Sequence, residues 1–158
     1  MSVDAMPQRP PFRFVDTIVE VSADRIVTTV RADPDADFFR GHYPGNPVMP
    51  GVLISEAVFQ SGALLVAHRE GVHDPRHGTP VLTRIRDARF RRMVRPGDVL
   101  SVEVVLDDAL DGAYYMTGRV TVDSHAVLRV SFACKLAPVD GAHAGGVRPA
   151  PGRDGACP

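Results

Sequence analysis

The sequence predicts an α+β fold, in which one curved antiparallel sheet of about six strands wraps around a single long helix. Three observations predict it. Two strand-like runs occupy residues 12–32, one apolar helical run follows at 52–68, and four further strand-like runs fill residues 83–137. An apolar helix between two sets of strands buries its surface best when the sheet curves around it.

The first two strands are predicted at residues 12–21 and 25–32. Both runs are rich in β-branched residues, and Ser22-Ala23-Asp24 between them favours a hairpin turn. The segment 33–37 contains three aspartates and one proline, which end the second strand.

A stiff loop precedes the predicted helix. Residues 41–51 contain three prolines and three glycines, and proline fixes φ whereas glycine allows sharp turns, so this loop can hold His42 in place. A proline in the first turn of a helix costs no hydrogen bond, so the helix begins near residue 50. Residues 52–68 are apolar around nearly the whole circumference, which is typical of a buried helix. Polar residues interrupt the run, so we expect a core helix and not a membrane span.

Four more strands are predicted at residues 83–94, 99–107, 113–123 and 125–137. Turn-forming residues join them in succession, which favours an antiparallel meander. We therefore expect one domain over 9–137. The remaining segments are an N-terminal extension at 1–8 and a Pro/Gly/Ala-rich tail at 138–158, which we expect to be disordered.

Composition and charge exclude several classes of function. The 158 residues carry a formal net charge of −1, which gives no global attraction for nucleic acid. The N-terminus lacks a signal-peptide pattern, so we expect a cytoplasmic protein. Cys134 and Cys157 form neither a disulfide framework nor a metal-ligand spacing. His73 and His77 lie four residues apart, but in a segment that is a poor helix former, so we expect no metal site there.

A base and an acid stand out in this pattern. His42 lies in the stiff loop, and Glu56 is the one acid in the apolar helix that follows. Burial of a carboxylate is costly unless it is protonated or paired, and Gln60 lies four residues on, where its amide can orient the carboxyl group. Either residue alone has an ordinary structural explanation. Together they predict acid–base chemistry.

The chain resembles the (3R)-hydroxyacyl-[acyl-carrier-protein] dehydratases of type II fatty-acid synthesis, which have the hot-dog fold. The resemblance covers about residues 9–137 and rests on several motifs: Pro11-Phe12 with Val15-Asp16, Phe38-Phe39-Arg40-Gly41-His42-Tyr43-Pro44-Gly45, Pro47-Val48-Met49-Pro50-Gly51-Val52-Leu53, Glu56-Ala57 with Gln60, and Ala88-Arg89-Phe90-Arg91-Arg92 with Val94 and Pro96-Gly97-Asp98. The start Gln8-Arg9-Pro10-Pro11-Phe12 departs from the usual His-Arg-Tyr-Pro-Phe, so a specialised polyketide or polyene pathway is an open alternative to fatty-acid synthesis.

The resemblance implies roles for these residues. His42 is the catalytic histidine and Glu56 the catalytic acid, and each active site takes the two residues from opposite subunits of a dimer. The isomerase-competent branch of the family has aspartate in place of this glutamate, so Glu56 indicates a plain dehydratase. Removal of water needs a base for the C2 proton and an acid for the C3 hydroxyl, and the Gly51 N–H at the helix start is the expected oxyanion donor. No metal or redox cofactor is required.

A basic run follows the helix, with Asp87 as its one acid. The run contains six arginines, namely Arg84, Arg86, Arg89, Arg91, Arg92 and Arg95. Two explanations are open: the arginines attract an acidic carrier protein, or they keep an edge strand from aggregating. We favour docking of the carrier.

Other functions remain open at the level of sequence. One class comprises hot-dog enzymes of different reaction, namely a CoA-dependent hydratase, a thioester isomerase or a thioesterase. Another is a subunit that pairs with a different hot-dog chain and supplies half of each site, or a module that only binds the carrier protein. The presence of both His42 and Glu56 favours a self-sufficient homodimer. The sequence leaves open whether such dimers assemble into a trimer of dimers.

Overall fold

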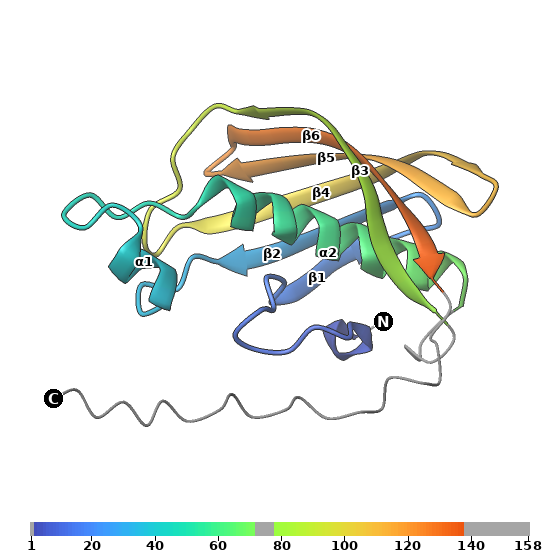
Figure 1. Ribbon diagram of the computed structural model, residues 1–158, viewed down its shortest axis with the longest axis horizontal. Coiled ribbons are helices and arrows are strands. Elements are labelled where there is room, and N and C mark those ends of the chain that lie inside the picture. The colour runs from blue at the N-terminus through green and yellow to red at the C-terminus, as the bar shows by residue number, and fades with distance from the viewer. Residues whose placement is uncertain (1, 72–77, 138–158) are drawn as a thin grey trace, which may run out of the picture.

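Within the residues that the computed structural model describes, 2–71 and 78–137, six strands form one antiparallel sheet that curves around a long helix (Figure 1). This is the predicted hot-dog fold. The elements in chain order are η1 (Val3–Ala5), β1 (Thr17–Val21), β2 (Arg25–Arg31), α1 (Asp37–Gly41), α2 (Gly51–Arg69), β3 (Thr79–Phe90), β4 (Val99–Leu110), β5 (Ala113–Val122) and β6 (His125–Ala137).

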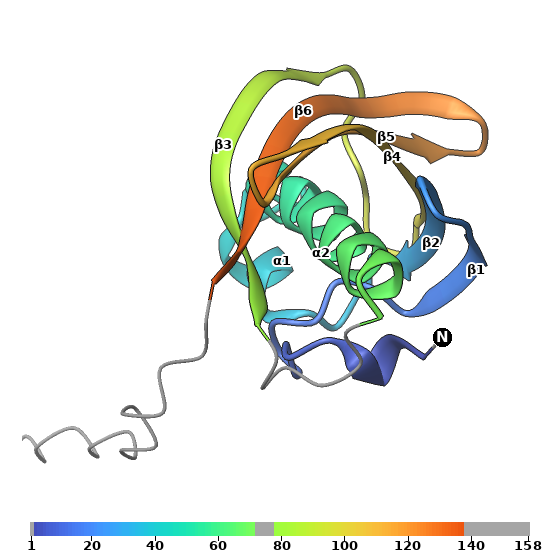
Figure 2. The ribbon, with the colours of Figure 1, turned by 90° about the vertical axis from the view of Figure 1, so that its right-hand side faces the viewer.

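Helix α2 lies in the hollow of the sheet (Figure 2). Its apolar side chains pack into the core, with Ala57 and Val58 fully buried and Leu64 and Leu65 at 1% exposure. The helix is long and apolar enough to cross a membrane, but 61% of that window is buried inside the protein. The length of this apolar run therefore reflects a core helix, as its interrupting polar residues predicted.

Close approach of α2 to the sheet depends on a glycine in β5. A Cβ atom added at Gly118 would lie 2.1 Å from Cγ1 of Val58. We expect Gly118→Ala to lower the free energy of unfolding by about 1–3 kcal/mol, because overpacking forces the helix or the strand to shift. Denaturant unfolding measures this change. Gly41→Ala is the control, since an added Cβ there meets no atom within 4 Å, and equal stability of the two variants would contradict the packing explanation.

The strand order is β1-β2-β4-β5-β6-β3. The predicted meander is confirmed for β4, β5 and β6 but is wrong for β3, which pairs only with β6 at the far edge of the sheet. After β3 the chain crosses the start of α2, where the Met49 N–H donates to the Val94 carbonyl, and β4 then pairs with β2. Turn residues at 96–98 mark that the chain turns, but they do not identify the partner strand.

The first strand is shorter than predicted. Residues 12–16 were expected to extend it, but β1 begins at Thr17 because the backbone before it bonds to a side chain of α2. The Phe14 N–H donates to Gln60 Oε1, and the Phe12 carbonyl accepts from Gln60 Nε2. The short helix α1 was not predicted either, since the prolines and aspartates around it indicate a loop.

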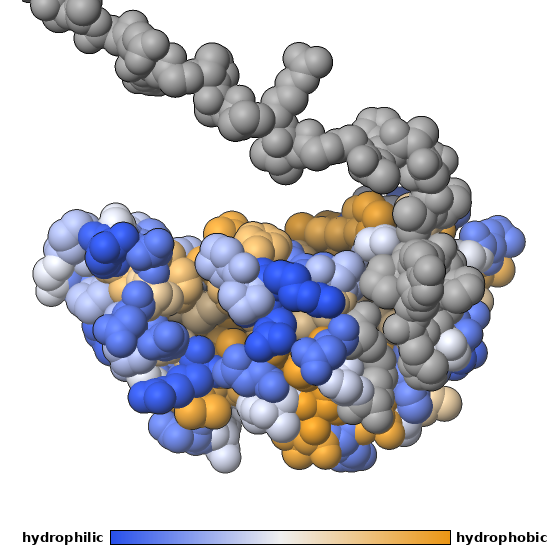
Figure 3. Space-filling view, turned by 90° about the horizontal axis from the view of Figure 1, so that it is seen from below, coloured by the Kyte–Doolittle hydropathy of each residue, from blue (hydrophilic) through white to orange (hydrophobic). Residues whose placement is uncertain are grey.

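The N-terminal segment packs against the underside of α2. Met6 is 1% exposed and belongs to the hydrophobic core, so packing extends into the segment 1–8 that we expected to be an extension. Viewed from this side, hydrophobic areas lie between hydrophilic ones on the surface (Figure 3). The predicted disorder of 138–158 and the pair His73 and His77 fall outside the described residues.

Candidate active site

His42 directly follows α1 and is partly buried. Its backbone N–H donates to the Phe38 carbonyl, which closes the helix, and its ring Nδ1 lies 2.8 Å from the Val48 carbonyl oxygen. A carbonyl oxygen can only accept, so Nδ1 carries a proton, and the tautomer that this contact favours has its lone pair on Nε2. The geometry favours the tautomer that a general base needs.

The loop around His42 is fastened at both ends, as its prolines and glycines predicted. Val48 and Met49 are buried, and the Met49 N–H is bonded to Val94. At the exposed side of the loop, the Arg95 guanidinium donates to Asn46 Oδ1 at 2.9 Å. These bonds hold the carbonyl that positions the His42 ring.

Glu56 lies on the second turn of α2 and is half-buried. Gln60 Nε2 donates to its carboxylate at 3.0 Å, so the predicted orienting contact is present. The Gln60 side chain is 1% exposed, and both ends of its amide are held by the backbone at Phe12 and Phe14. Gln60 is therefore a rigid support that links Glu56 to the N-terminal segment.

Glu56 opens onto a pocket of about 250 Å³ between α2 and the β3–β6 side of the sheet. The pocket is mainly apolar, and its lining residues are Gln8, Glu56, Phe59, Gln60, Ala63, Pro80, Val81, Leu82, Phe132 and Cys134. Burial raises the pKa of the Cys134 thiol to about 11, so this residue is a neutral part of the wall at physiological pH. An apolar pocket with one carboxyl group at its mouth suits an acyl chain.

His42 does not line the pocket of Glu56 in the same chain. Among the hydrogen bonds and ion pairs of the described residues, none joins the two side chains. Within the described part of one chain, His42 and Glu56 are therefore held by separate contacts and do not share a pocket.

Gly51 begins α2 and lies under the ring of Phe90. A Cβ atom at Gly51 would come within 2.9 Å of that ring, so a larger residue would push the end of β3 away. Over the described part of the chain, no hydrogen bond uses the Gly51 N–H, whereas the Leu53 and Ile54 N–H groups bond to Pro50. An unpaired N–H at a helix N-terminus is suited to an oxyanion.

Comparisons with known proteins agree with this geometry. The FabA-like domain family matches residues 6–131. Two relatives are 3-hydroxyacyl-[acyl-carrier-protein] dehydratases FabZ: that of Syntrophotalea carbinolica is 39% identical over 134 residues, which cover 84% of this chain and 90% of the relative, and that of Oenococcus oeni is 41% identical over 119 residues, which cover 75% and 84%. The chain belongs to the FabA-like family.

Solved structures share the fold at low identity. The dehydratase heterocomplex ApeI:P from Xenorhabdus doucetiae matches with a TM-score of 0.74 and 16% identity, over 87% of this chain and 91% of that one. Protein PH1136 from Pyrococcus horikoshii matches with a TM-score of 0.63 and 16% identity, over 84% and 91%. These similarities confirm the hot-dog fold of this FabA-like chain.

The six arginines of the basic run divide between two places in this FabA-like domain. Arg84, Arg86 and Arg89 pair in register with Ala133, Ser131 and Arg129, which puts them on the outer face of the sheet, away from α2. Arg91, Arg92 and Arg95 lie on the segment between β3 and β4. The Arg95 guanidinium donates to Asn46 in the His42 loop, whereas the Arg92 guanidinium donates to the Val122 carbonyl at the end of β5. All six are exposed, and within the described residues none forms an ion pair.

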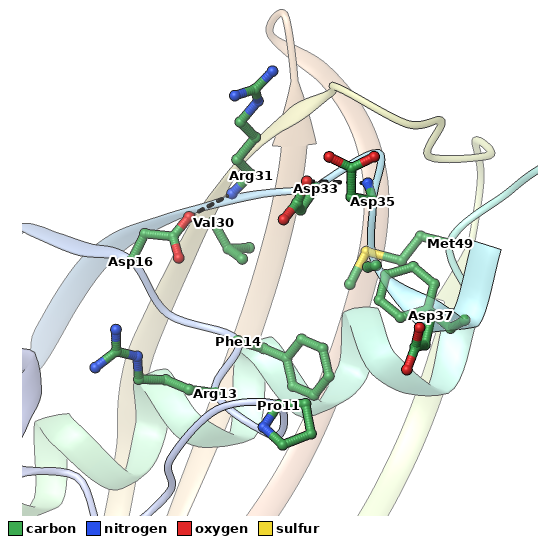
Figure 4. A pocket seen from close by; sticks show the side chains of 12 residues that line it. Pro11, Arg13, Phe14, Asp16, Val30, Arg31, Asp33, Asp35, Asp37 and Met49 are labelled. Carbon is green, nitrogen blue, oxygen red and sulfur yellow. Dashed lines mark hydrogen bonds between the residues drawn. The ribbon is translucent and has the colours of Figure 1, made fainter. Parts of the chain in front are cut away.

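A larger pocket, of about 420 Å³, lies between the segment before β1, the end of β2 and α1 (Figure 4). Charged side chains surround it, and Asp16 accepts from the Arg31 backbone while Asp33 accepts from the Asp35 backbone. Neither His42 nor Glu56 lines it. Of these two pockets, the smaller one is therefore the one beside Glu56.

Proposed function

We propose that this chain dehydrates (3R)-3-hydroxyacyl-[acyl-carrier-protein] to trans-2-enoyl-[acyl-carrier-protein], in fatty-acid or type II polyketide/polyene synthesis in the cytoplasm. The observation that carries the proposal is the carboxyl group of Glu56, which accepts from Gln60 and lines a mainly apolar pocket. The favoured tautomer of His42 and the FabZ dehydratases among the relatives support the same reaction.

The residues divide the work of an elimination. Nε2 of His42 takes the C2 proton, and the electron pair of that C–H bond forms the C2–C3 double bond. Protonated Glu56 gives its proton to the C3 hydroxyl, which leaves as water. The Gly51 N–H donates to the thioester oxygen as negative charge develops there. Protons move but no electrons are gained or lost overall, so the reaction requires no redox cofactor.

The proposed active unit is a dimer in which His42 of one subunit meets Glu56 of the other. Strand β3 supports this arrangement, because every residue from Val81 to Phe90 is exposed and one of its edges has no partner within the described residues. Ile85 and Phe90 face the helix side of the sheet, yet each is 51% exposed. A long edge strand with exposed apolar side chains is a site for pairing with another chain.

A second hot-dog chain of different sequence could occupy the same edge. Because this chain retains both His42 and Glu56, we propose a homodimer. Light scattering of the purified protein measures its mass and also shows whether dimers assemble into a trimer of dimers. If the purified chain is a monomer that becomes dimeric and active only with another hot-dog chain, the homodimer is wrong. The chain would then be a subunit that supplies half of each active site.

The reaction is tested with the purified chain and a (3R)-3-hydroxyacyl thioester, once on carrier protein and once on CoA. Mass spectrometry of the products is expected to show loss of water from the carrier-linked substrate. Preferred turnover of the CoA-linked form would indicate a hydratase. Release of the free acid would indicate a thioesterase, and a shifted double bond an isomerase.

Gln60 is expected to act as a positioning residue. Gln60→Met keeps the size of the side chain but removes the amide that holds Glu56. We expect kcat to fall about tenfold or more while KM changes little, because the orientation of a catalytic group affects the chemical step. Steady-state kinetics measures both constants. Gln60→Glu keeps an acceptor for the Phe14 N–H but loses the amide N–H that donates to Glu56. Activity as high as wild type in both variants would exclude the positioning role.

We propose that the six arginines dock an acidic carrier protein, chiefly through the three nearest the His42 loop. We expect the triple change of Arg91, Arg92 and Arg95 to glutamate to raise KM for carrier-linked substrate at least tenfold, because attraction becomes repulsion. KM for the same acyl group on pantetheine should stay within about twofold. The matched control reverses Arg84, Arg86 and Arg89 on the outer face. A larger effect of that control, or an equal effect on pantetheine substrate, would contradict this docking site.

A further inference from the structure

Gln8 lines the Glu56 pocket, and its side-chain oxygen has no hydrogen-bond partner. Among the described residues, this Oε1 is the buried side-chain polar atom that lacks a partner, and a turn of the amide would be needed to present it to the pocket. We propose that Gln8 recognises a second hydroxyl group on the acyl chain, so that the preferred substrate is a 3-hydroxyacyl chain that carries another hydroxyl further from the thioester. This inference rests on the proposed dehydratase function.

One wall of the pocket is a face of α2. Glu56, Phe59, Gln60 and Ala63 follow the helical spacing that places residues on one face, and this face extends for about 10 Å. An extended chain advances about 1.2 Å per bond, so the face spans about eight bonds. The acyl chain beyond C3 would therefore lie against the same walls that Gln8 joins.

The other polar groups of the pocket already have partners or are neutral. Gln60 uses its oxygen for Phe14, and its nitrogen for Phe12 and Glu56. Cys134 stays a neutral thiol because burial raises its pKa to about 11. Glu56 is assigned to the C3 hydroxyl in the proposed reaction, so Gln8 offers the remaining hydrogen-bonding capacity among the lining residues of this pocket.

An unpartnered buried carbonyl costs free energy, so Gln8 loses nothing when its amide turns towards a donor in the pocket. A plain acyl chain offers no donor, whereas a hydroxyl group needs one acceptor and carries no charge that the apolar walls would disfavour. Chain growth by two carbons leaves oxygen on odd-numbered carbons, so C5, C7 and C9 are the expected positions. A keto reduction without subsequent dehydration must supply such a substrate.

The test compares decanoyl-pantetheine with its 5-, 7- and 9-hydroxy forms in calorimetric titration of the wild-type oligomer. None of these probes carries a C3 hydroxyl, so binding is measured without turnover. We expect at least one hydroxylated probe to bind about five- to tenfold more tightly than the plain chain, the effect of one neutral hydrogen bond. Gln8→Met is expected to reduce that ratio to about one, whereas Leu82→Met, a matched wall variant, should preserve it.

Equal affinity for all four probes in the wild type would overturn the proposal, whether or not the Gln8→Met variant folds. A preference that survives in Gln8→Met would overturn it too, because another group would then bind the hydroxyl. Turnover of plain 3-hydroxydecanoyl thioester is measured in parallel. If the hydroxylated probes bind selectively but this thioester is not turned over, the dehydratase function is rejected and the role of Gln8 is kept. Failure of the proposed function is thus distinguishable from failure of this inference.

Discussion

His42→Ala is expected to lower kcat for dehydration by about 10²–10⁴-fold, the usual contribution of a positioned general base. Alanine removes Nε2, the proposed acceptor of the C2 proton, whereas the fold loses the contact of Nδ1 with the Val48 carbonyl and the packing of the ring on Tyr43. Glu56→Gln is expected to cause a loss of similar size. The amide oxygen of the new residue can still accept from Gln60, so the change removes the acidic proton with little effect on packing. Steady-state kinetics on carrier-linked substrate measures both losses.

The matched control is His68→Ala. His68 lies in the last turn of the same helix that carries Glu56 and is likewise partly buried, but it lines no part of the Glu56 pocket. Its replacement should leave kcat within about twofold. Wild-type activity in His42→Ala would show that His42 is not the base. Equal losses of kcat in the control and in the two site variants would show that the losses come from a general effect on the fold.

Ile85→Asp is expected to convert the protein to monomers and to abolish activity as fully as loss of His42. Ile85 lies on edge strand β3 and is 51% exposed in the single chain, so a charge there costs the folded monomer little. In a dimer paired through this edge, the same carboxylate would be buried without a partner, which is costly. Light scattering gives the mass, and the activity assay is run on the same sample.

Val19→Asp tests whether any charge on an edge strand has this effect. Val19 is 62% exposed on β1, the opposite edge of the sheet, so its replacement should change neither the dimer nor kcat. A fully active Ile85→Asp monomer would show that one chain holds a complete site. Dissociation by Val19→Asp alone would move the interface to β1.

Much of this fold follows from local patterns in the sequence. The apolar run predicted α2 within two residues at either end, since a buried helix with no polar face has few other interpretations. The runs rich in β-branched residues predicted β2, and the turn residues between the later runs predicted the meander of β4 to β6. The position of β3 at the edge of the sheet was not predicted. It depends on the path of the segment between β3 and β4, and the turn residues in that segment do not specify which strand β4 pairs with.

The site was predicted unevenly. The helical spacing of Glu56 and Gln60 predicted the contact between them, and the structure has it. The catalytic roles of His42 and Glu56 stay predictions. Gln8 was missed, since its role depends on the N-terminal segment folding under α2. The division of the arginines between two faces was also missed, because bulges in β3 change which residues face outward.

The composite active site is tested most directly by mixing two inactive variants. His42→Ala and Glu56→Gln chains are coexpressed with different tags, and the hybrid dimer is purified. A hybrid dimer contains one site with both catalytic residues and one with neither, so we expect about half the activity of the wild-type dimer, or about a quarter in an unsorted equimolar mixture. A hybrid as inactive as its two parents would contradict the account, because it would place His42 and Glu56 of the same chain in one site.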